Sequence, residues 1–292
     1  MKKRIGIAVL GLGWMGQAHS RAALRIASLF PDAKFKPELV VCADVEQSRR
    51  DRAVNDFGFA RAVPGFEEAV SAKDVDAVWV TAPNMLHVPM ISAAAAAGKA
   101  IFSEKPIGGT PAQTVEAFKI ATKHSTATGV GYNYLWSPLV IHARELISSG
   151  AIGRVTHYRG RFLSMYGSDE LGLLTWRFKF AQAGYGVTSD ILSHSVSLAH
   201  FLVGDIAEVT GMKNNTITLD HYQLAQPVIT AAANPPIRKV KSKTKTSPRC
   251  FAHSRTAQRA LSKQVAQWSA QKAKMHSRST APRALFHGTS KN

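Results

Sequence analysis

The sequence predicts an α/β fold, with a doubly wound parallel sheet in its first half. Three observations predict it. Short apolar runs alternate with segments of helical spacing, and a glycine-patterned turn directly follows the first run. The chain of 292 residues also exceeds one typical domain, so a second domain is expected.

The elements follow in order along the chain. Five apolar runs predict buried strands: Ile5–Leu10, Leu39–Ala43, Ala77–Thr81, Ala100–Phe102 and Gly129–Gly131. Four segments have helical spacing: Gln17–Leu29, Gln47–Phe57, Met85–Ala97 and Pro111–His124. Downstream we expect a helix at Ser137–Ser149, a long strand at Arg154–Leu163 and a helix at Ser189–Val203.

The charges are unevenly distributed. Residues 1–213 hold 23 Lys and Arg against 18 Asp and Glu, whereas residues 214–292 hold 14 basic residues and one acid, Asp220. Only one of the 21 glycines lies after residue 213. The net charge of +18 therefore comes mainly from the last quarter of the chain, which needs its own explanation.

The composition also indicates a compartment. No stretch of 18 residues is continuously apolar, which predicts a soluble protein without a membrane span. Met1–Leu10 is similar to the start of a secretory signal, but no small-residue cleavage site follows, so we expect none. The two cysteines, Cys42 and Cys250, provide neither a disulfide framework nor metal-ligand spacing. We expect a cytoplasmic protein without a bound metal.

The glycine turn carries the first functional motif. Gly11, Gly13 and Gly16 enclose Leu12, Trp14 and Met15 between the first strand and the first helix. The first glycine permits a tight turn, the second lets the backbone approach a pyrophosphate, and the third lets helix and strand pack closely. Amide groups at the helix start then meet the phosphates. In this strand–turn–helix context the motif predicts a dinucleotide site of Rossmann type.

Asp44, at the end of the second strand, is the candidate ribose ligand. A carboxylate here accepts hydrogen bonds from the ribose hydroxyls and repels a 2′-phosphate, which favours NAD. NADP stays an alternative because Arg49 and Arg50 follow closely. Asp44 lies 28 residues after Gly16 rather than about 20, and we attribute the excess to an insert at Pro31–Pro37.

Two further clusters follow strands and so belong to the carboxyl edge of the sheet, where ligands of such folds bind. Their cofactor-binding candidates are Thr81, Pro83, Asn84, His87, Glu104 and Lys105. Lys105 has a second expected role, because a lysine there can stabilise negative charge on a substrate oxygen. Taken alone, Glu104-Lys105 has the alternative interpretation of a surface ion pair.

Asp190 and His194 lie four residues apart, so they share one face of the predicted helix. A histidine that exchanges a proton near neutral pH suits a general base for an alcohol undergoing oxidation. On its own, such a pair is more typical of a structural contact. We predict that Lys105, Asp190 and His194 form the catalytic group.

Together these motifs resemble the glucose-fructose oxidoreductase/inositol dehydrogenase/MocA (Gfo/Idh/MocA) family. The motifs that carry the resemblance are Gly11–Gly16, Thr81–Asn84 with His87, Glu104–Pro106, Gly131–Asn133, Gly150–Gly153, Trp176–Arg177, Gly184–Gly186, Asp190 and His194. The resemblance implies a Rossmann domain followed by a substrate domain with an open, mostly antiparallel sheet. It implies hydride exchange between a nicotinamide and a hydroxyl-bearing carbon of a sugar, inositol or related polyol.

The resemblance also implies roles for single residues. Lys105 would bind the reacting oxygen, with a cis bond to Pro106, while His194 would move the proton and Asp190 would orient the substrate. Asn133, with Tyr132, would border the nicotinamide. The remaining implied residues are Trp176 and Arg177, which would line the cleft. After Gly131–Asn133, where the family commonly has an arginine near position 134 or 135, this chain has Tyr134-Leu135.

We expect three regions: a cofactor domain at 1–125, an incomplete substrate and dimerisation domain at 126–213, and a basic tail at 214–292. We expect the family resemblance to end near Lys213, because no strand pattern follows. Three interpretations of the tail stay open: a nucleic-acid-binding arm, a solvated extension, and, favoured, translation out of frame. The alternative to an active homo-oligomeric oxidoreductase is therefore an inactive nucleotide-binding protein with a basic arm.

Overall fold

The computed structural model describes residues 2–164, 175–186, 188–209, 220–224 and 237–241. Its centre is a six-stranded sheet in the order β3-β2-β1-β4-β5-β6, and every neighbouring pair is parallel. The strands are β1 (Lys3–Leu10), β2 (Phe35–Ala43), β3 (Arg61–Val63), β4 (Ala77–Val80), β5 (Ala100–Ser103) and β6 (Thr128–Val130). The order reverses between β1 and β4, which is where such folds bind dinucleotides.

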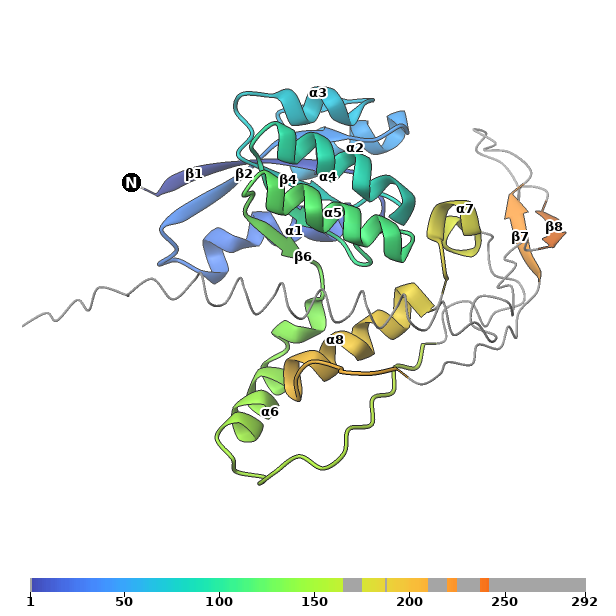
Figure 1. Cartoon of the computed structure of the whole chain (residues 1–292). Coiled ribbons are helices and arrows are strands. Elements are labelled where there is room, and N and C mark those ends of the chain that lie inside the picture. Colours follow the sequence, from blue (N-terminus) through green and yellow to red (C-terminus); the bar gives the residue numbers. More distant parts are fainter. Residues whose placement is uncertain (1, 165–174, 187, 210–219, 225–236, 242–292) are drawn as a thin grey trace, which may run out of the picture.

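Helices cover both faces of this sheet (Figure 1). One face packs against α1 (Trp14–Leu29) and α2 (Gln47–Phe57). The opposite face packs against α3 (Phe66–Ser71), α4 (His87–Ala96) and α5 (Pro111–Lys123). A 3₁₀ turn, η1 (Asn84–Leu86), precedes α4. The predicted doubly wound α/β fold is confirmed.

Burial on both faces explains why the strands read as continuous apolar runs. In β1, Ala8 and Leu10 contribute to the core under α3–α5, while Ile7 and Val9 contribute to the core under α1 and α2. Because successive side chains of a strand point to opposite faces, both sets must be apolar.

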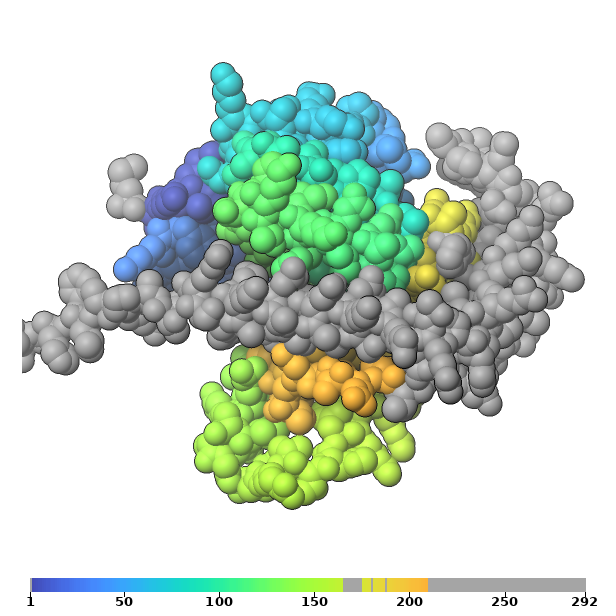
Figure 2. Space-filling view, viewed as in Figure 1, coloured from blue at the N-terminus to red at the C-terminus, as the bar shows by residue number. Residues whose placement is uncertain are grey.

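The chain then leaves the sheet and forms a second group of helices, which includes α6 (Pro138–Ser148) and α8 (Ser193–Leu202). These two helices lie side by side in a lobe beyond β6 (Figures 1 and 2). The Arg144 guanidinium joins them, because Nη1 donates to the Phe201 carbonyl at 2.8 Å. The 3₁₀ turn η2 (Asn133–Trp136) precedes α6, and the short elements between α6 and α8 are η3 (Trp176–Phe178), α7 (Phe180–Ala183) and η4, a π-helical turn (Thr188–Leu192).

Four differences from the sequence predictions have local causes. β3 and α3 were not predicted, because each is too short to show a clear hydrophobic periodicity. Residues 154–163 form no regular element, so the long strand predicted there is wrong; a strand exists only through pairing, and no described strand pairs with it. The presumed insert Pro31–Pro37 is partly strand, since Lys3 pairs with Phe35.

The fourth difference lies in the tail. Here β7 (Asp220–Leu224) and β8 (Ile237–Lys241) form an antiparallel pair, with Leu224 opposite Ile237. The sequence prediction of no strand beyond Lys213 is therefore wrong for these two segments. The rest of the tail, Cys250 included, lies outside the described residues. Within the part of the chain that the structure describes, no helix is both long and apolar enough to cross a membrane.

Candidate functional site

The glycine turn between β1 and α1 is shaped by close backbone approach. Gly11 has a φ of +98°, and a methyl group on it would lie 2.9 Å from the backbone of Ala82. A methyl group on Gly16 would lie 2.0 Å from the Gly11 carbonyl oxygen. Around Gly13, by contrast, no described atom lies within 4 Å of such a methyl group. The protein itself therefore requires Gly11 and Gly16, whereas Gly13 faces open space.

The start of α1 is suited to an anion. The first amide groups of a helix, here from Trp14, Met15 and Gly16, have no acceptor within the helix. Together with the helix dipole they favour negative charge at this end. The Trp14 side chain is 75% exposed, so it does not take part in the core.

Asp44 follows β2 and is buried against this turn. One carboxylate oxygen accepts from the Leu12 amide at 2.7 Å, and the other accepts from the Glu46 amide at 2.9 Å. The Arg49 guanidinium lies 3.5 Å from the first oxygen. Asp44 thus fixes the glycine turn and keeps a carboxylate at the end of the sheet where a ribose would lie.

Two predicted cofactor residues hold the loops that surround the turn. The Thr81 hydroxyl donates to the Gly11 carbonyl at 2.6 Å. The Asn84 amide donates to the Ala183 carbonyl at 3.0 Å, although 99 residues separate them. Both side chains are buried, and Pro83 between them is partly exposed. In this structure, Thr81 and Asn84 fix backbone that borders the site.

His87 is 1% exposed and lies between two backbone carbonyls. Its Nδ1 is 2.9 Å from the Pro106 oxygen and its Nε2 is 2.8 Å from the Ala82 oxygen. Burial lowers the pKa of His87, although both carbonyls oppose this shift. A neutral imidazole has one N–H, so it donates to one of the two oxygens. His87 therefore joins the loop after β4 to the loop after β5.

Glu104 carries a buried carboxylate at the end of β5. One oxygen is 2.7 Å from His19 Nε2 on α1, and the other accepts from the Lys105 amide at 3.2 Å. Gly131 makes room for this carboxylate, because a methyl group there would lie 2.7 Å from it. The sequence analysis did not predict His19. The feature that could have identified it is its position, since it is a polar residue three positions after Gly16 on the helix face that packs on the sheet.

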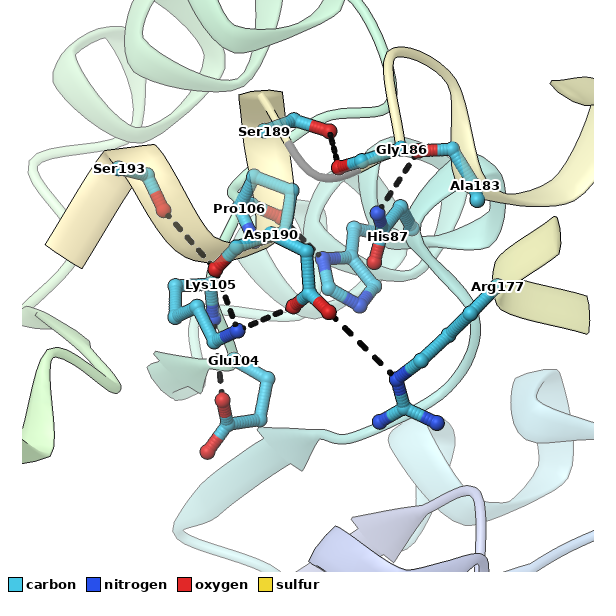
Figure 3. Close-up of polar contacts among 11 residues, drawn as sticks. His87, Glu104, Lys105, Pro106, Arg177, Ala183, Gly186, Ser189, Asp190 and Ser193 are labelled. Atoms are coloured by element: carbon cyan, nitrogen blue, oxygen red, sulfur yellow. Dashed lines mark hydrogen bonds and ion pairs between the residues drawn. The ribbon is translucent and has the colours of Figure 1, made fainter. Parts of the chain in front are cut away.

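Lys105 is the centre of a charged cluster (Figure 3). Its ammonium donates to the Asp190 carboxylate and, at 3.0 Å, to the Asp190 carbonyl oxygen. The other Asp190 carboxylate oxygen is 3.8 Å from Arg177 Nε. The Lys105–Pro106 bond is cis, as the resemblance implied. Lys105 and Asp190, separated by 85 residues in sequence, are thus in direct contact.

His194 lies one helical turn after Asp190 and is 5% exposed. The pKa of its imidazole is lowered from 6.5 to about 4, first by burial and then by the Lys105 charge; Asp190 and Glu104 oppose the shift. This value lies below the neutral range in which the sequence-based expectation placed its proton exchange. The reason is that His194 is enclosed by aromatic rings, of which Tyr134 and Phe162 were not predicted.

The predicted residues thus form two linked groups. Gly11, Asp44 and Thr81 surround the start of α1, and Lys105 lies with Asp190 and His194; His87 connects the two loops between them. Asn133, at the start of η2, is exposed.

Neither a metal centre nor a second chemical site is found in the described part of the chain. Among the described residues, no three His, Cys, Asp or Glu side chains are grouped to hold a metal ion. An apolar groove of about 560 Å³, lined by Ile5, Ile26, Phe35 and Trp79 among others, lies at the amino edge of the sheet. It is remote from Lys105 and His194, so chemistry is not assigned to it.

Comparison with protein families gives two matches. The family described as "Oxidoreductase family, NAD-binding Rossmann fold" (Gfo/Idh/MocA) matches residues 5–132, and the C-terminal domain of the same family matches residues 140–290. The expectation that the resemblance ends near Lys213 is thus wrong. Charge and glycine content are averages, and they do not record the order of residues on which a family match depends.

Comparison with single proteins gives consistent relatives. Levoglucosan dehydrogenase from Pseudarthrobacter phenanthrenivorans is 31% identical over 215 residues, 74% of this chain and 55% of that protein. The NAD(+)-dependent scyllo-inositol 2-dehydrogenase from Bacillus subtilis is 28% identical over 230 residues, 77% of this chain and 61% of that protein. The chain therefore spans only 55% to 61% of these two relatives.

Solved structures agree. The structure of levoglucosan dehydrogenase in complex with NADH has a TM-score of 0.73 and 29% identity, covering 82% of this chain and 61% of that one. Its complex with NADH and levoglucosan has a TM-score of 0.68 and 31% identity, covering 70% of this chain and 55% of that one.

Proposed function

The chain belongs to the Gfo/Idh/MocA oxidoreductase family, and from this we propose that it transfers hydride between the nicotinamide of NAD and a hydroxyl-bearing carbon of a sugar, inositol or related polyol. The observation that carries the proposal is the contact of Lys105 with Asp190, one helical turn before His194. A cation that binds oxygen and a proton acceptor are the two groups that alcohol oxidation requires from a protein.

The residues around α1 fit a dinucleotide. Gly13 faces open space beside the amide groups that begin the helix, so a pyrophosphate can approach the backbone. Asp44 holds a buried carboxylate at the neighbouring strand end and favours the ribose hydroxyls of NAD. Arg49, 3.5 Å from Asp44, is the group that would receive the 2′-phosphate of NADP, so NADP is the second cofactor to test.

The chain's own residues define the proton chemistry. The Lys105 ammonium has three donors, of which two point to Asp190, so one remains for a substrate oxygen. Its charge stabilises the alkoxide that forms as the hydroxyl loses its proton. His194, neutral above a pH of about 4, accepts that proton. Asp190 keeps the ammonium in place. Bound NAD supplies the hydride acceptor.

The substrate class follows from the relatives and from the polar groups. The relatives act, by name, on levoglucosan and on scyllo-inositol, both compact polyhydroxylated rings. Asp190 and Arg177 lie beside Lys105 and can accept from and donate to neighbouring hydroxyl groups of such a ring. We therefore propose a cyclic polyol or anhydrosugar substrate.

Turnover of a polyol panel with NAD tests the proposal. Lys105→Ala and His194→Ala are each expected to reduce kcat by about 10²–10⁴-fold. Both variants should still bind NADH, because neither side chain contacts the glycine turn. Matched controls are the exposed residues Lys119 and His142, whose replacement by alanine should leave kcat unchanged.

Two results would reject the proposal. One is wild-type protein that binds NADH but oxidises no member of the panel and reduces no corresponding ketone. The other is a His194→Ala variant with wild-type kcat.

Location and assembly complete the proposal. We propose a cytoplasmic location because the protein would use NAD, and a homo-oligomer because subunits of the family usually associate. Cell fractionation tests the location, and light scattering on the full chain tests the oligomeric state. A monomer at micromolar concentration would contradict the proposed homo-oligomer.

A further inference from the structure

The surroundings of His194 contain a feature that the proposed chemistry does not use. Three aromatic rings approach its imidazole: Tyr132 at 5.9 Å, Tyr134 at 4.8 Å and Phe162 at 5.5 Å between ring centroids. The two tyrosines meet it edge-on, at 87° and 84°, whereas Phe162 is stacked within 18° of parallel. We call these three residues the aromatic box.

The box is assembled from separate segments. Tyr132 and Tyr134 come from the turn after β6, and Phe162 comes from residues 154–163, which run beside α8 (Figure 1). Gly160 permits this close approach, because a methyl group on it would lie 2.4 Å from the Ser195 hydroxyl on α8. Phe162 is half-buried, while its neighbour Leu163 is 89% exposed. The segment therefore turns one ring specifically toward His194.

The box changes what His194 can do. The imidazole has no protein partner for Nδ1 among the described residues, so neither a carboxylate nor a carbonyl fixes it through that atom. Ring contacts of this geometry are worth about 0.5–1.5 kcal/mol each and can hold the ring plane in place of a hydrogen bond. They also exclude water from a group whose charged form needs it.

The charged and titratable groups around His194 are few. Lys105 and Glu104 face it from the loop after β5, and Asp190 faces it from the π-helical turn; Tyr132 and Tyr134 face it from the turn after β6. Burial and Lys105 favour the neutral imidazole, while the two carboxylates favour the charged one. Burial is the largest of these contributions, and the three aromatic rings are among the groups packed around the imidazole.

We propose that Tyr134 and Phe162 are positioning residues that, with Tyr132, hold the His194 imidazole neutral and fixed in plane, ready to accept the substrate proton. The role of His194 as acceptor of the substrate proton rests on the proposed function, whereas the neutral and fixed state of its imidazole does not. Tyr134 meets the histidine with a ring edge.

Histidine NMR on the full chain tests the box directly. Protein labelled at histidine nitrogen and carbon, with His194→Gln to assign the signal, reports the charge of this ring whether or not turnover is found. In the wild type, His194 should stay neutral at about pH 6, whereas Phe162→Ala should raise its pKa by about 1 unit or more because water reaches one face of the ring. Tyr134→Ala, at a position that is 41% exposed and hence tolerant, should shift it in the same direction.

The conservative variants Phe162→Tyr and Tyr134→Phe keep the ring contacts and should keep the wild-type titration. In turnover, the acid limb of the pH–kcat profile should move upward with the NMR pKa in the alanine variants while KM changes little. Two results overturn the proposal: a wild-type His194 that titrates near 6.5, or alanine variants of intact fold, by circular dichroism, with an unchanged His194 pKa. If the NMR shifts occur but the wild type oxidises no polyol, the box stands and the proposed function fails.

Discussion

Replacement of Gly13 separates cofactor binding from folding. Its φ of −65° and ψ of −165° are allowed for any L-residue, and no described atom lies within 4 Å of an added methyl group. Replacing a glycine reduces the conformational entropy of the unfolded chain, which should stabilise the folded state by about 0.4–1 kcal/mol. Losing it at a helix N-cap should cost a similar amount, about 0.5–1 kcal/mol. The two effects nearly cancel, so Gly13→Val should unfold in urea within about 1 kcal/mol of the wild type.

NADH binding should respond quite differently. The valine side chain of Gly13→Val fills the space through which a pyrophosphate approaches the backbone. A loss of about 2.8 kcal/mol, which is a hundredfold in Kd, is expected in a fluorescence titration.

Gly16→Ala is the matched comparison for this experiment. Its methyl group would lie 2.0 Å from the Gly11 oxygen, an overlap that costs about 1–3 kcal/mol, which the better helix propensity of alanine offsets by at most about 1 kcal/mol. Gly16→Ala should therefore lose stability and binding together. A Gly13→Val protein with wild-type NADH affinity, or one as unstable as Gly16→Ala, would refute the reasoning.

Three further predictions follow from single contacts. Asp44→Ala removes the ribose acceptor and frees Arg49, so the ratio of NADH to NADPH affinity should fall at least about tenfold in fluorescence titrations; an unchanged ratio would exclude this role. His87→Ala should lower the free energy of unfolding by about 3 kcal/mol in urea, because buried carbonyls lose a donor and a cavity forms, while His142→Ala should change little. Because the folded pKa of His194 is about 4 and the reference value is 6.5, the unfolded state binds more protons between these values. Stability should thus decline as pH falls through that window, and less so in His194→Gln; equal slopes in thermal unfolding would contradict the assignment.

The sheet could be predicted because its strands are buried on both faces. Runs such as Ile5–Leu10 must be apolar throughout, so a simple count finds them. Regular structure that depends on a partner could not be found in this way. β3 has three residues, and Arg154–Leu163 has the composition of a strand but no partner in the described part of the chain. Pairing is a property of two segments, and one segment's pattern does not contain it.

The candidate site was predictable in its position but not in its contacts. Because the carboxyl ends of parallel strands meet at one edge, residues after β1, β2, β4 and β5 were expected together, and Asp44, Thr81 and Lys105 are found there. Which group each one contacts depends on loop geometry. His87 was expected at the cofactor, and in the structure it lies between two carbonyls, since its position at the start of α4 directs it into the protein.

His194 shows most clearly what a sequence leaves out. Its type gives a reference pKa of 6.5, and its spacing from Asp190 gives the helix face, but both statements concern only its own helix. The pKa in the folded chain depends on burial and on Lys105, 89 residues earlier in sequence. Phe162, which stacks on the imidazole, lies 32 residues earlier in a segment without regular structure. No local sequence pattern records that these two residues lie near His194 in space. The state of the proposed proton-transfer group therefore depends on contacts between the two parts of the chain, which is why a change in the 154–163 segment should alter the proposed chemistry at the sheet edge.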